Sequence, residues 1–502
     1  MNSKYERYHE ILKKITDVSS SGAVLAWDQE VLMPPKSADI RAQQLATLAG
    51  ISHEISTSDE LGKLLNELSK DATLTEGGKR NVKNSLKDYT NRKKFTVEFI
   101  EQLNRSISEA FQAWQTAKKE SNFNLFAPKL EKLVELKRKE CEVLGYKDHP
   151  YDALIDQYEP GTCTKDVEVL FAEVRKQLVP FIKQIAAAKA NNDAFMYKAF
   201  DKDVQWNYGL DILKQMGYDF QAGRQDLSTH PFTTSFSPTD VRITTRISEN
   251  NFNEMLWSTI HEGGHGLYEQ GLPVENYGLP SGETVSLGIH ESQSRLWENV
   301  VGRGLHFWKG NYSALKNLFP ENLKNVSVTD FYKGINMVRP SLIRTNADEL
   351  TYHSHILIRF EIEKALIEGS IGVNELPEYW NAKYKEYLGL DVPDAAHGVL
   401  QDIHWSHGSF GYFPTYSLGS FYAVQFYAQA KKDIPQLESE IEKCNTKPLL
   451  HWLREKIHRH GKYYSAEEMC INITGEKLNF NYFMEYARKK YSGIYELMTV
   501  DA

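Results

Sequence analysis

Apolar residues recur every three or four positions along most of this chain, which is the spacing of an amphipathic helix. The stretch from 80 to 145 is a long example, with charged residues between the apolar ones. We see no internal repeat, no low-complexity segment and no clear linker between domains. The pattern therefore predicts a mainly helical protein whose residues 1–502 form a single domain.

One segment departs from this helical spacing. It is rich in Thr, Phe, Val and Ile and is interrupted by Ser-Pro-Thr-Asp, so we predict a β-hairpin with strands at 232–236 and 241–247. Asp240, Arg242 and Thr244 alternate along the second strand and therefore face one side. We expect them to hold the small sheet against the helix that follows. A second possibility is that this strand edge binds an extended peptide by β-augmentation.

A helix is predicted directly after the hairpin. Asn251 is the expected N-cap, Glu254 completes a capping-box pattern, and Gly271 followed by Leu-Pro ends the helix. Its sequence contains STIHEGGHGLYEQG, in which each glycine costs roughly 1 kcal/mol relative to alanine. Close approach of a neighbouring backbone or of a substrate would explain why glycines stand in this helix despite their cost.

Composition narrows the class of protein. With 41% hydrophobic and 25% charged residues, the chain can bury a substantial core. A net charge of -8 with scattered acidic residues argues against a nucleic-acid partner. No run approaches the roughly 20 apolar residues of a membrane span. The four cysteines are far apart, form no CxxC pair and fit a reducing compartment, so we expect a cytoplasmic protein.

The two histidines of the predicted helix have metal-ligand spacing. His261 and His265 lie four residues apart, so their imidazoles project from one face of the helix. Two neutral imidazoles placed in this way can hold one zinc ion at about 2.0–2.1 Å. Glu262 points to the side of the pair and can reach a water on the metal without binding the metal, which suits a general base. The alternative is two surface histidines on an amphipathic helix.

A catalytic zinc needs a third protein ligand and an open position for water. Glu291 follows His265 by 26 residues, on a segment that can form the next helix over 288–298. Close packing of the two helices would explain the glycines between them. Glu291 also lies four residues before Arg295, so an ordinary helical ion pair is the alternative. Three further residues near this segment are rival ligands, namely Glu283, His290 and Glu298.

The ordered motifs of the chain resemble those of one family, the thermostable or Taq-type metallocarboxypeptidases. The resemblance covers nearly the whole sequence. It runs through WDQEVLMPP at 27–35, YDALIDQYEPG at 151–161, HPF at 230–232, DVRIT at 240–244, HEGGH at 261–265, HESQ at 290–293, IRTNAD at 343–348 and GVLQDIHW at 398–405.

The resemblance implies a mainly helical, two-lobed fold with a deep groove, similar to neurolysin and angiotensin-converting enzyme. It implies release of single amino acids from peptide C-termini, with broad tolerance but poor action near proline. It also implies one zinc or cobalt ion per subunit and a homodimer. By motif position, His261, His265 and Glu291 would bind the metal, and Glu262 would be the catalytic carboxylate.

A carboxypeptidase must also bind the free carboxylate at the end of its substrate. Arg344 is our candidate, because a guanidinium holds a carboxylate bidentately and keeps its charge. The alternative is a surface ion pair with Asp348, four residues later. Asp348 can equally orient a metal-bound histidine through its second nitrogen.

Segment 401–416 concentrates histidine and tyrosine around turn-forming glycines. We expect Tyr416 to donate to the oxyanion that forms during peptide hydrolysis, and His404 to bind substrate or orient another group. The alternative is that these aromatic residues only pack. Two other functions compete with the carboxypeptidase: an endopeptidase that uses the same metal helix, and a helical peptide-binding scaffold with a structural, four-ligand metal site.

Overall fold

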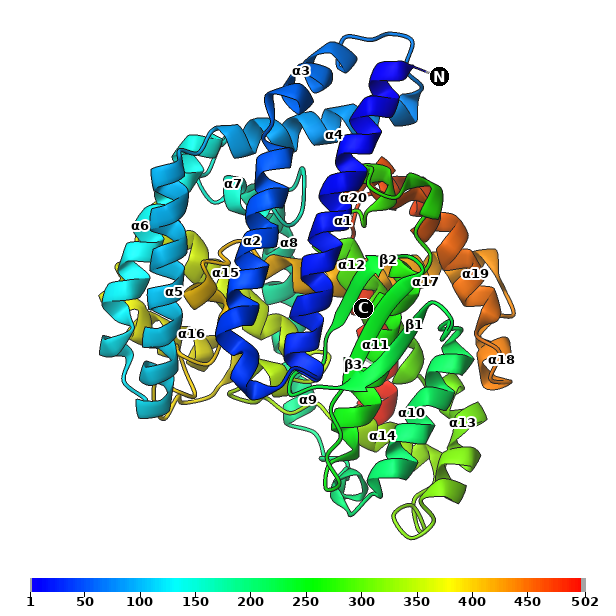
Figure 1. Cartoon of the computed structure of the whole chain (residues 1–502). Coiled ribbons are helices and arrows are strands. Elements are labelled where there is room, and N and C mark those ends of the chain that lie inside the picture. Colours follow the sequence, from blue (N-terminus) through cyan, green and yellow to red (C-terminus); the bar gives the residue numbers. More distant parts are fainter. Residues whose placement is uncertain (1, 498–502) are drawn as a thin grey trace. The chain divides into compact units, whose positions relative to one another are not determined.

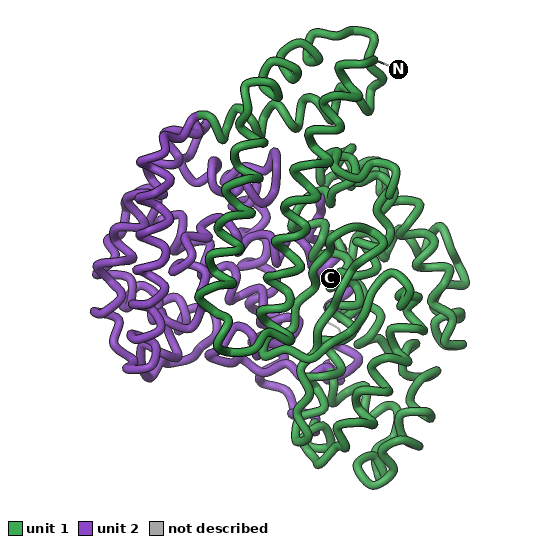
Figure 2. Tube along the Cα trace, in the orientation of Figure 1, with its two compact units in different colours: residues 1–93, 193–335, 422–477 green, residues 94–192, 336–421, 478–502 purple. Residues whose placement is uncertain are grey.

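The computed structural model describes residues 2–497. They form two compact units, each assembled from three separate segments of the chain (Figure 2). Unit 1 contains the residues up to Lys93, Asp193–Ile335 and Tyr422–Lys477. Unit 2 contains Lys94–Asn192, Asn336–Phe421 and the residues from Leu478 onward. The expectations of a single catalytic domain and of a deep groove stay predictions.

Helices make up most of both units, which confirms the predicted fold class (Figure 1). The α-helices of unit 1 are α1 (Ser3–Val31), α2 (Ala38–Ser56), α3 (Asp59–Leu68), α4 (Glu76–Lys93), α10 (Lys202–Met216), α11 (Phe252–Glu269), α12 (Leu287–Arg295), α13 (Leu305–Leu318), α14 (Val328–Ile335), α18 (Leu437–Glu442), α19 (Lys447–Lys456) and α20 (Ala466–Thr474). A π-helical segment, Leu296–Gly302, continues α12.

Unit 2 is also helical, and the long periodic stretch from 80 to 145 divides into α4, α5 and α6. The α-helices of unit 2 are α5 (Val97–Glu120), α6 (Ala127–Leu144), α7 (Asp152–Ile155), α8 (Thr164–Glu173), α9 (Val179–Ala186), α15 (Thr351–Glu368), α16 (Leu376–Leu388) and α21 (Asn481–Tyr495). Helix α17 (Pro414–Asp433) contributes residues to both units. Within residues 2–497, no helix has both the length and the apolar character that crossing a membrane requires.

Unit 1 contains a three-stranded sheet in the order β1 (Gly223–Leu227), β3 (Asp240–Thr245), β2 (Thr233–Ser237). Strands β2 and β3 pair antiparallel, which confirms the predicted hairpin. Strand β1 pairs parallel with β3. The sequence does not predict β1, because GRQDL has a single apolar residue and no β-branched one.

The face of the sheet that packs on α11 is not the predicted one. Thr245 on β3 is fully buried, and its hydroxyl lies 2.7 Å from the hydroxyl of Ser258 on α11. Because side chains alternate along a strand, Asp240, Arg242 and Thr244 lie on the opposite face. The expectation that these three residues hold the sheet against the metal helix was therefore wrong.

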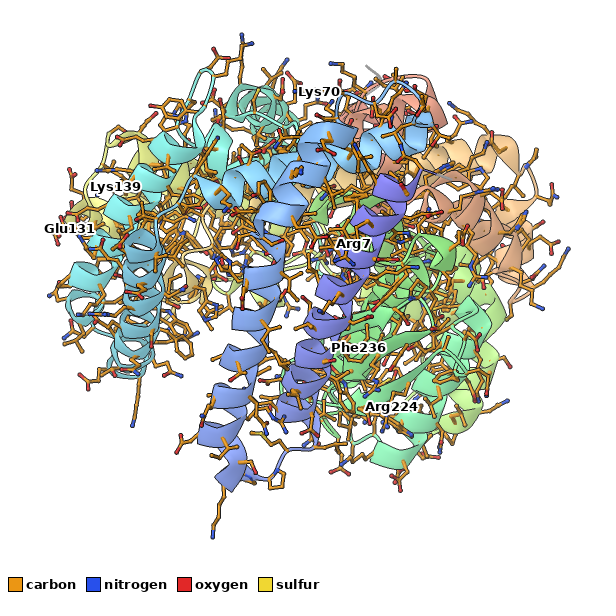
Figure 3. All side chains as sticks on the ribbon, turned by 45° about the horizontal axis from the view of Figure 1, so that its top comes forward. Arg7, Lys70, Glu131, Lys139, Arg224 and Phe236 are labelled. Carbon is orange, nitrogen blue, oxygen red and sulfur yellow. The ribbon has the colours of Figure 1, made fainter. Side chains whose placement is uncertain are left out.

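That opposite face of the sheet packs on α1. The guanidinium of Arg242 lies 4.5 Å from the centre of the Trp27 ring of α1, and that of Arg224 on β1 lies 5.4 Å from it. Arg224 and Phe236 are labelled on this side of the sheet in Figure 3. The carbonyl of Phe236 accepts a hydrogen bond from Ser20 of α1 at 3.0 Å. The sheet thus lies between α1 and α11.

Helix α11 begins as predicted, but without its capping box. The Asn251 side chain accepts a hydrogen bond from the backbone N–H of Asn253 at 3.3 Å. The Glu254 carboxylate accepts from Nε of Arg246 at 2.8 Å and from the side-chain amide of Asn251 at 3.4 Å, and not from the backbone N–H of that N-cap. The helix ends at Glu269, two residues before the predicted stop at Gly271.

Candidate functional site

The two histidines of α11 and one glutamate of α12 come together in unit 1. Nε2 of His265 lies 3.4 Å from Oε2 of Glu291, and Nε2 of His261 lies 3.8 Å from the same oxygen. The ligand atoms of these three residues all lie within 4.8 Å of one another. Two imidazoles and one carboxylate are a typical donor set for a catalytic zinc, so these residues fit a divalent metal ion.

The other nitrogen of His261 has a carboxylate partner. Nδ1 of His261 lies 2.9 Å from Oε2 of Glu298, in the π-helical segment that follows α12. Such a carboxylate fixes the tautomer and the orientation of a metal-binding imidazole. Glu298, a rival ligand in the sequence, therefore orients the His261 ring and leaves its Nε2 facing Glu291.

Arg295 links the two carboxylates. Its Nε donates to Oε1 of Glu291 at 2.7 Å, and its Nη1 donates to Oε2 of Glu298 at 3.1 Å. The predicted helical ion pair is thus present, and it occupies the oxygen of Glu291 that points away from the histidines. The ion pair and the metal-ligand role of Glu291 are compatible.

His265 is supported by ring stacking. Its ring lies 4.4 Å from that of His290 at an interplanar angle of 22°, and Nε2 of His290 lies 2.9 Å from Oε1 of Glu269. Nδ1 of His265 is buried and has no hydrogen-bond partner among residues 2–497. His290 and Glu283, the other rival ligands, do not belong to the candidate metal cluster of the described residues.

The pKa shifts of Glu291 and His265 favour metal binding, whereas the shift of His261 favours the protonated imidazole, whose proton a metal has to displace. Burial would raise the pKa of Glu291, but Arg295 and the histidines outweigh it and hold that pKa well below its ordinary value. Burial similarly opposes ionisation of Glu298, yet Arg295 and His261 lower its pKa to about 2. Burial lowers the pKa of His265 to about 3, so its imidazole is neutral and can bind a cation. For His261, the neighbouring carboxylates outweigh burial and raise the pKa.

Glu262 is buried beside this cluster and has a different environment. Its Oε2 accepts a hydrogen bond from the hydroxyl of Thr233 on β2 at 2.6 Å. Burial raises the pKa of Glu262, in contrast to Glu291. Thr233 lies in the predicted hairpin, but no sequence signal marked it as a partner of the metal helix.

The glycines of α11 let three neighbours approach the metal helix. A Cβ on Gly264 would lie 2.7 Å from the Cα of Ser294, so the backbone of α12 touches the helix at this point. Gly263 faces side chains of α10, and Gly266 faces the Tyr218 ring, 2.8 Å from where its Cβ would be. The prediction of close helix packing is confirmed for Gly264, while the other two glycines accommodate α10 and Tyr218.

Arg344 lies in unit 2 in a short 3₁₀ turn, Arg344–Asn346, and is 7% exposed. Its Nε donates to Oδ1 of Asp402 at 2.9 Å, and its Nη1 donates to the hydroxyl of Tyr352 at 2.9 Å. The sequence did not identify Asp402 as a partner, although it lies inside the GVLQDIHW motif. Arg359 on α15 donates to the other oxygen of Asp402 at 2.6 Å.

The alternative pairing of Arg344 with Asp348 is not formed. The Asp348 carboxylate accepts hydrogen bonds from the backbone N–H groups of Arg339, Leu350 and Thr351 at 2.9 to 3.0 Å. Asp348 therefore fixes the start of α15. Asp348 is therefore not the carboxylate that orients a histidine of the candidate metal site. Glu298 contacts Nδ1 of His261 instead.

His404 and Tyr416 come together with Arg344. Nε2 of His404 lies 3.2 Å from the Tyr416 hydroxyl, and the Arg344 guanidinium lies 5.2 Å from the centre of the Tyr416 ring. Burial lowers the pKa of His404 to about 3, so this histidine is neutral. Two guanidinium groups, Arg344 and Arg359, against the one carboxylate of Asp402 leave a surplus of one positive charge, which favours an anionic ligand.

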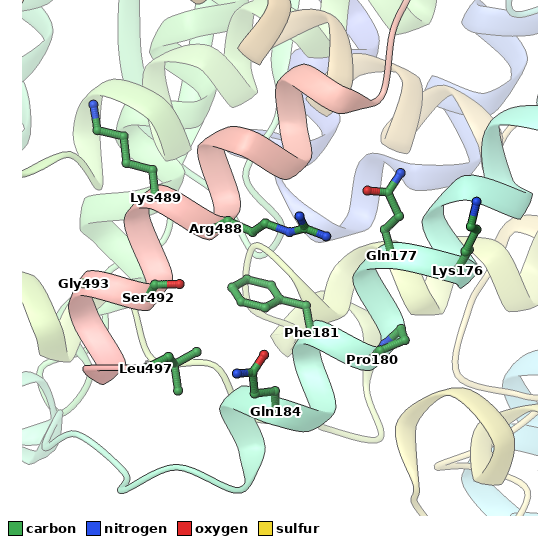
Figure 4. A pocket seen from close by; sticks show the side chains of 10 residues that line it. All are labelled: Lys176, Gln177, Pro180, Phe181, Gln184, Arg488, Lys489, Ser492, Gly493 and Leu497. Carbon is green, nitrogen blue, oxygen red and sulfur yellow. The ribbon is translucent and has the colours of Figure 1, made fainter. Parts of the chain in front are cut away.

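A cavity of about 1120 Å³ elsewhere in unit 2 is separate from these residues. It lies between segment 176–184 and α21, and Figure 4 shows Arg488 reaching across it above Phe181. None of the candidate residues is among the described residues that line it, so we do not assign it to the site. Its lining is formed by Lys176, Gln177, Pro180, Phe181, Gln184, Arg488, Lys489, Ser492, Gly493 and Leu497.

Comparison with known proteins identifies the family. The model of the carboxypeptidase Taq (M32) metallopeptidases matches residues 7–491. Carboxypeptidase 1 of Bacillus subtilis is 40% identical over 496 residues, which cover 98% of this chain and 99% of that protein.

Solved structures agree. The M32 carboxypeptidase of Deinococcus radiodurans is 36% identical with a TM-score of 0.97, and the match covers 99% of this chain and 100% of that one. The carboxypeptidase of Pyrococcus furiosus is 37% identical with a TM-score of 0.95, covering 98% and 99%. These matches confirm the resemblance drawn from the motifs and exclude a non-enzymatic scaffold. The chain therefore belongs to the carboxypeptidase Taq (M32) metallopeptidase family and is a peptide hydrolase.

Proposed function

We propose that this protein is a metallocarboxypeptidase that releases single amino acids from peptide C-termini, with a zinc or cobalt ion held by His261, His265 and Glu291. The observation that carries the proposal is this set of three ligand atoms within 4.8 Å, beside a buried glutamate that is not part of it. Structural zinc sites close with four protein ligands, whereas three ligands leave a position for water. The family membership supports the same reaction.

Glu262 is the general base of this proposal. A divalent ion at the three ligands would supply a Lewis acid and a more acidic water. The Glu262 carboxylate takes a proton from the attacking water and later delivers it to the leaving amine. Burial raises the pKa of Glu262 from its ordinary value, which helps the protonated carboxyl to form in the first step. The Thr233 hydroxyl holds Oε2 and thereby fixes the direction of the carboxylate.

We assign recognition of the terminal carboxylate to Arg344. A guanidinium has five N–H donors. Nε and Nη2 of Arg344 contact Asp402, and Nη1 donates to Tyr352. Each of the three nitrogens thus uses one hydrogen, and the second hydrogens of Nη1 and Nη2 remain for a substrate. Tyr416 is the proposed donor to the oxyanion, and neutral His404 is the group that binds the substrate or the Tyr416 hydroxyl.

Three further properties follow from membership of the family rather than from the geometry. We propose broad tolerance for the terminal residue, poor cleavage next to proline, and a homodimer. The peptide substrate and the metal are the partners that this function requires.

The test uses one peptide in two forms, with a free and with an amidated C-terminus. The metal-loaded protein is incubated with each, and the products are measured by mass spectrometry, with Glu262→Gln as the matched inactive control. We expect a ladder of products shortened from the free C-terminus and little reaction of the amidated form. Internal fragments from both forms would overturn the proposal and show an endopeptidase that uses the same metal helix.

A further inference from the structure

Glu363 of α15 is a fully buried carboxylate that the proposed chemistry does not use. Its Oε2 accepts hydrogen bonds from the Tyr151 hydroxyl at 2.5 Å and from the backbone N–H of Gly411 at 2.9 Å. Its Oε1 accepts from Nε1 of Trp405 at 2.8 Å. A buried carboxylate with three donors is expensive to replace, because removing it leaves each donor unpaired.

Two of these three partners belong to one segment, 404–416, which carries two of the unit 2 candidates, His404 and Tyr416. Trp405 directly follows His404, and Gly411 lies five residues before Tyr416. Glu363 therefore holds the segment at Trp405 and at Gly411, on either side of the turn at Gly408. Gly411 also has a φ of 90°, and a Cβ there would lie 2.6 Å from the carbonyl carbon of Leu154 on α7. The segment is thus held between α15 and α7.

The third partner of Glu363, Tyr151, belongs to the YDALIDQYEPG motif, which has no role in the proposed function. Tyr151 opens this motif and donates to Glu363, while Tyr158 of the same motif packs edge-on against Tyr412 at 5.1 Å. The Tyr412 ring in turn lies 5.3 Å from that of His404 and 5.2 Å from that of Tyr416. The motif thus contacts the buried carboxylate through Tyr151 and the aromatic rings around His404 and Tyr416 through Tyr158.

We infer that Glu363 is a positioning residue, which fixes segment 404–416 through Tyr151, Trp405 and Gly411 and thereby orients His404 and Tyr416 toward the peptide substrate. The last step of this inference rests on the proposed function. Lys137 on α6 is a cation whose charge acts on Glu363, and its ammonium pairs with Glu140 at 2.6 Å. No cation contacts the Glu363 carboxylate among the hydrogen bonds of the described residues, so N–H and O–H donors alone hold it.

The experiment compares Glu363→Gln with Glu349→Gln. In E363Q, one carboxylate oxygen is replaced by an NH₂ group, which is itself a donor. It therefore faces at least one of the three donors and breaks that hydrogen bond. Glu349 is a matched control in the same unit, since it is 8% exposed and accepts from the Tyr491 hydroxyl at 2.7 Å and from Lys490 at 2.8 Å, both on α21. Three quantities are measured: hydrogen exchange of the peptides that cover 401–416, kcat/KM, and bound metal.

We expect E363Q to exchange faster over 401–416 and to lose about tenfold or more in kcat/KM, with metal content unchanged. E349Q should change neither exchange in this segment nor kcat/KM. If E363Q does not fold, Tyr151→Phe, which removes one of the three donors, should give the same pattern at a smaller size. Unchanged exchange and activity in E363Q, or equal losses in E349Q, would overturn the inference.

Tyr416→Phe separates a failure of this inference from a failure of the proposed function. Full activity in Y416F would refute the catalytic role proposed for Tyr416 and, with it, the functional half of the inference. A large loss in Y416F together with full activity in E363Q would refute the positioning role of Glu363 alone.

Discussion

Replacing Gly264 by alanine should weaken both the fold and the metal site. The new Cβ would lie 2.7 Å from the Cα of Ser294 and 2.8 Å from the carbonyl oxygen of Gln293, and both atoms belong to the backbone of α12. Carbon atoms in ordinary contact are roughly 3.5–4.0 Å apart, so α12 must move by about 1 Å. Because α12 carries Glu291, this movement displaces the carboxylate from the two imidazoles on α11.

The magnitude follows from two opposing effects. Alanine in a helix interior is favoured over glycine by about 1 kcal/mol. Overpacking typically costs about 1–3 kcal/mol, and the upper end applies because neither clashing atom is the flexible end of a side chain. We therefore expect a net destabilisation of about 1–2 kcal/mol. Gly50→Ala is the matched control, since Gly50 lies in α2 with no atom within 4 Å of its would-be Cβ, and it should be neutral or stabilising.

The assay combines thermal unfolding of the metal-free protein with a zinc titration against a chelator. G264A should unfold at a lower temperature than G50A and wild type, and should bind zinc at least about tenfold more weakly, because ligand sets lose affinity when displaced by about 1 Å. A G264A protein with wild-type thermal stability and zinc affinity would refute the claim that this glycine sets the distance between α11 and α12.

Three further outcomes are expected. Glu262→Gln should abolish turnover while bound metal, measured by elemental analysis, stays at the wild-type level; substantial remaining activity would contradict the base assignment. Glu298→Gln should lower metal affinity roughly 10–100-fold in a chelator competition, because His261 loses its orienting carboxylate; wild-type affinity would show that the orientation is set elsewhere. Burial raises the pKa of Glu363 from 4.5 to about 7, so the folded state binds more protons between these values. The stability present below pH 4.5 is then lost as pH rises through 7, by on the order of 3 kcal/mol. The free energy of unfolding of the wild type, measured with denaturant between pH 4.5 and 7, should fall by this amount. An equal fall in E363Q would assign the pH dependence to another group.

The features that the sequence predicts well are those that depend on local spacing. His261 and His265 are fixed by helical geometry alone, and the hairpin follows from alternation and a turn signal. The third candidate ligand is different. Glu291 and Glu298 are seven residues apart, about two helical turns, so periodicity places both on one face and does not choose between them. The choice is made by tertiary structure, where one carboxylate meets Nε2 and the other meets Nδ1 of the same histidine.

Partners that are distant in sequence were not predictable for the same reason. The local spacing offered Asp348 as the alternative partner of Arg344, but Asp402, 58 residues away, contacts it instead. Nothing in the local pattern around Asp402 distinguishes a buried ion-pair partner from a solvated loop residue. Strand β1 was missed because its five residues are stabilised by pairing with β3 and not by their own propensity. Arg242 faces α1 because Ile243 and Thr245, on the other face of β3, contact α11, and an alternating pattern alone does not reveal which face meets the helix.

Arg295 holds two neighbouring buried carboxylates at the candidate metal site. Two buried carboxylates close together would normally be costly, and burial favours their neutral forms. Arg295 lies between them and donates to both, at 2.7 and 3.1 Å, and its positive charge lowers the pKa of Glu291 and of Glu298 and keeps both ionised. Without this guanidinium, burial would drive Glu291 toward its protonated form, which is a poor ligand. The same residue that made Glu291 look like a simple helical ion pair therefore keeps it available as a metal ligand.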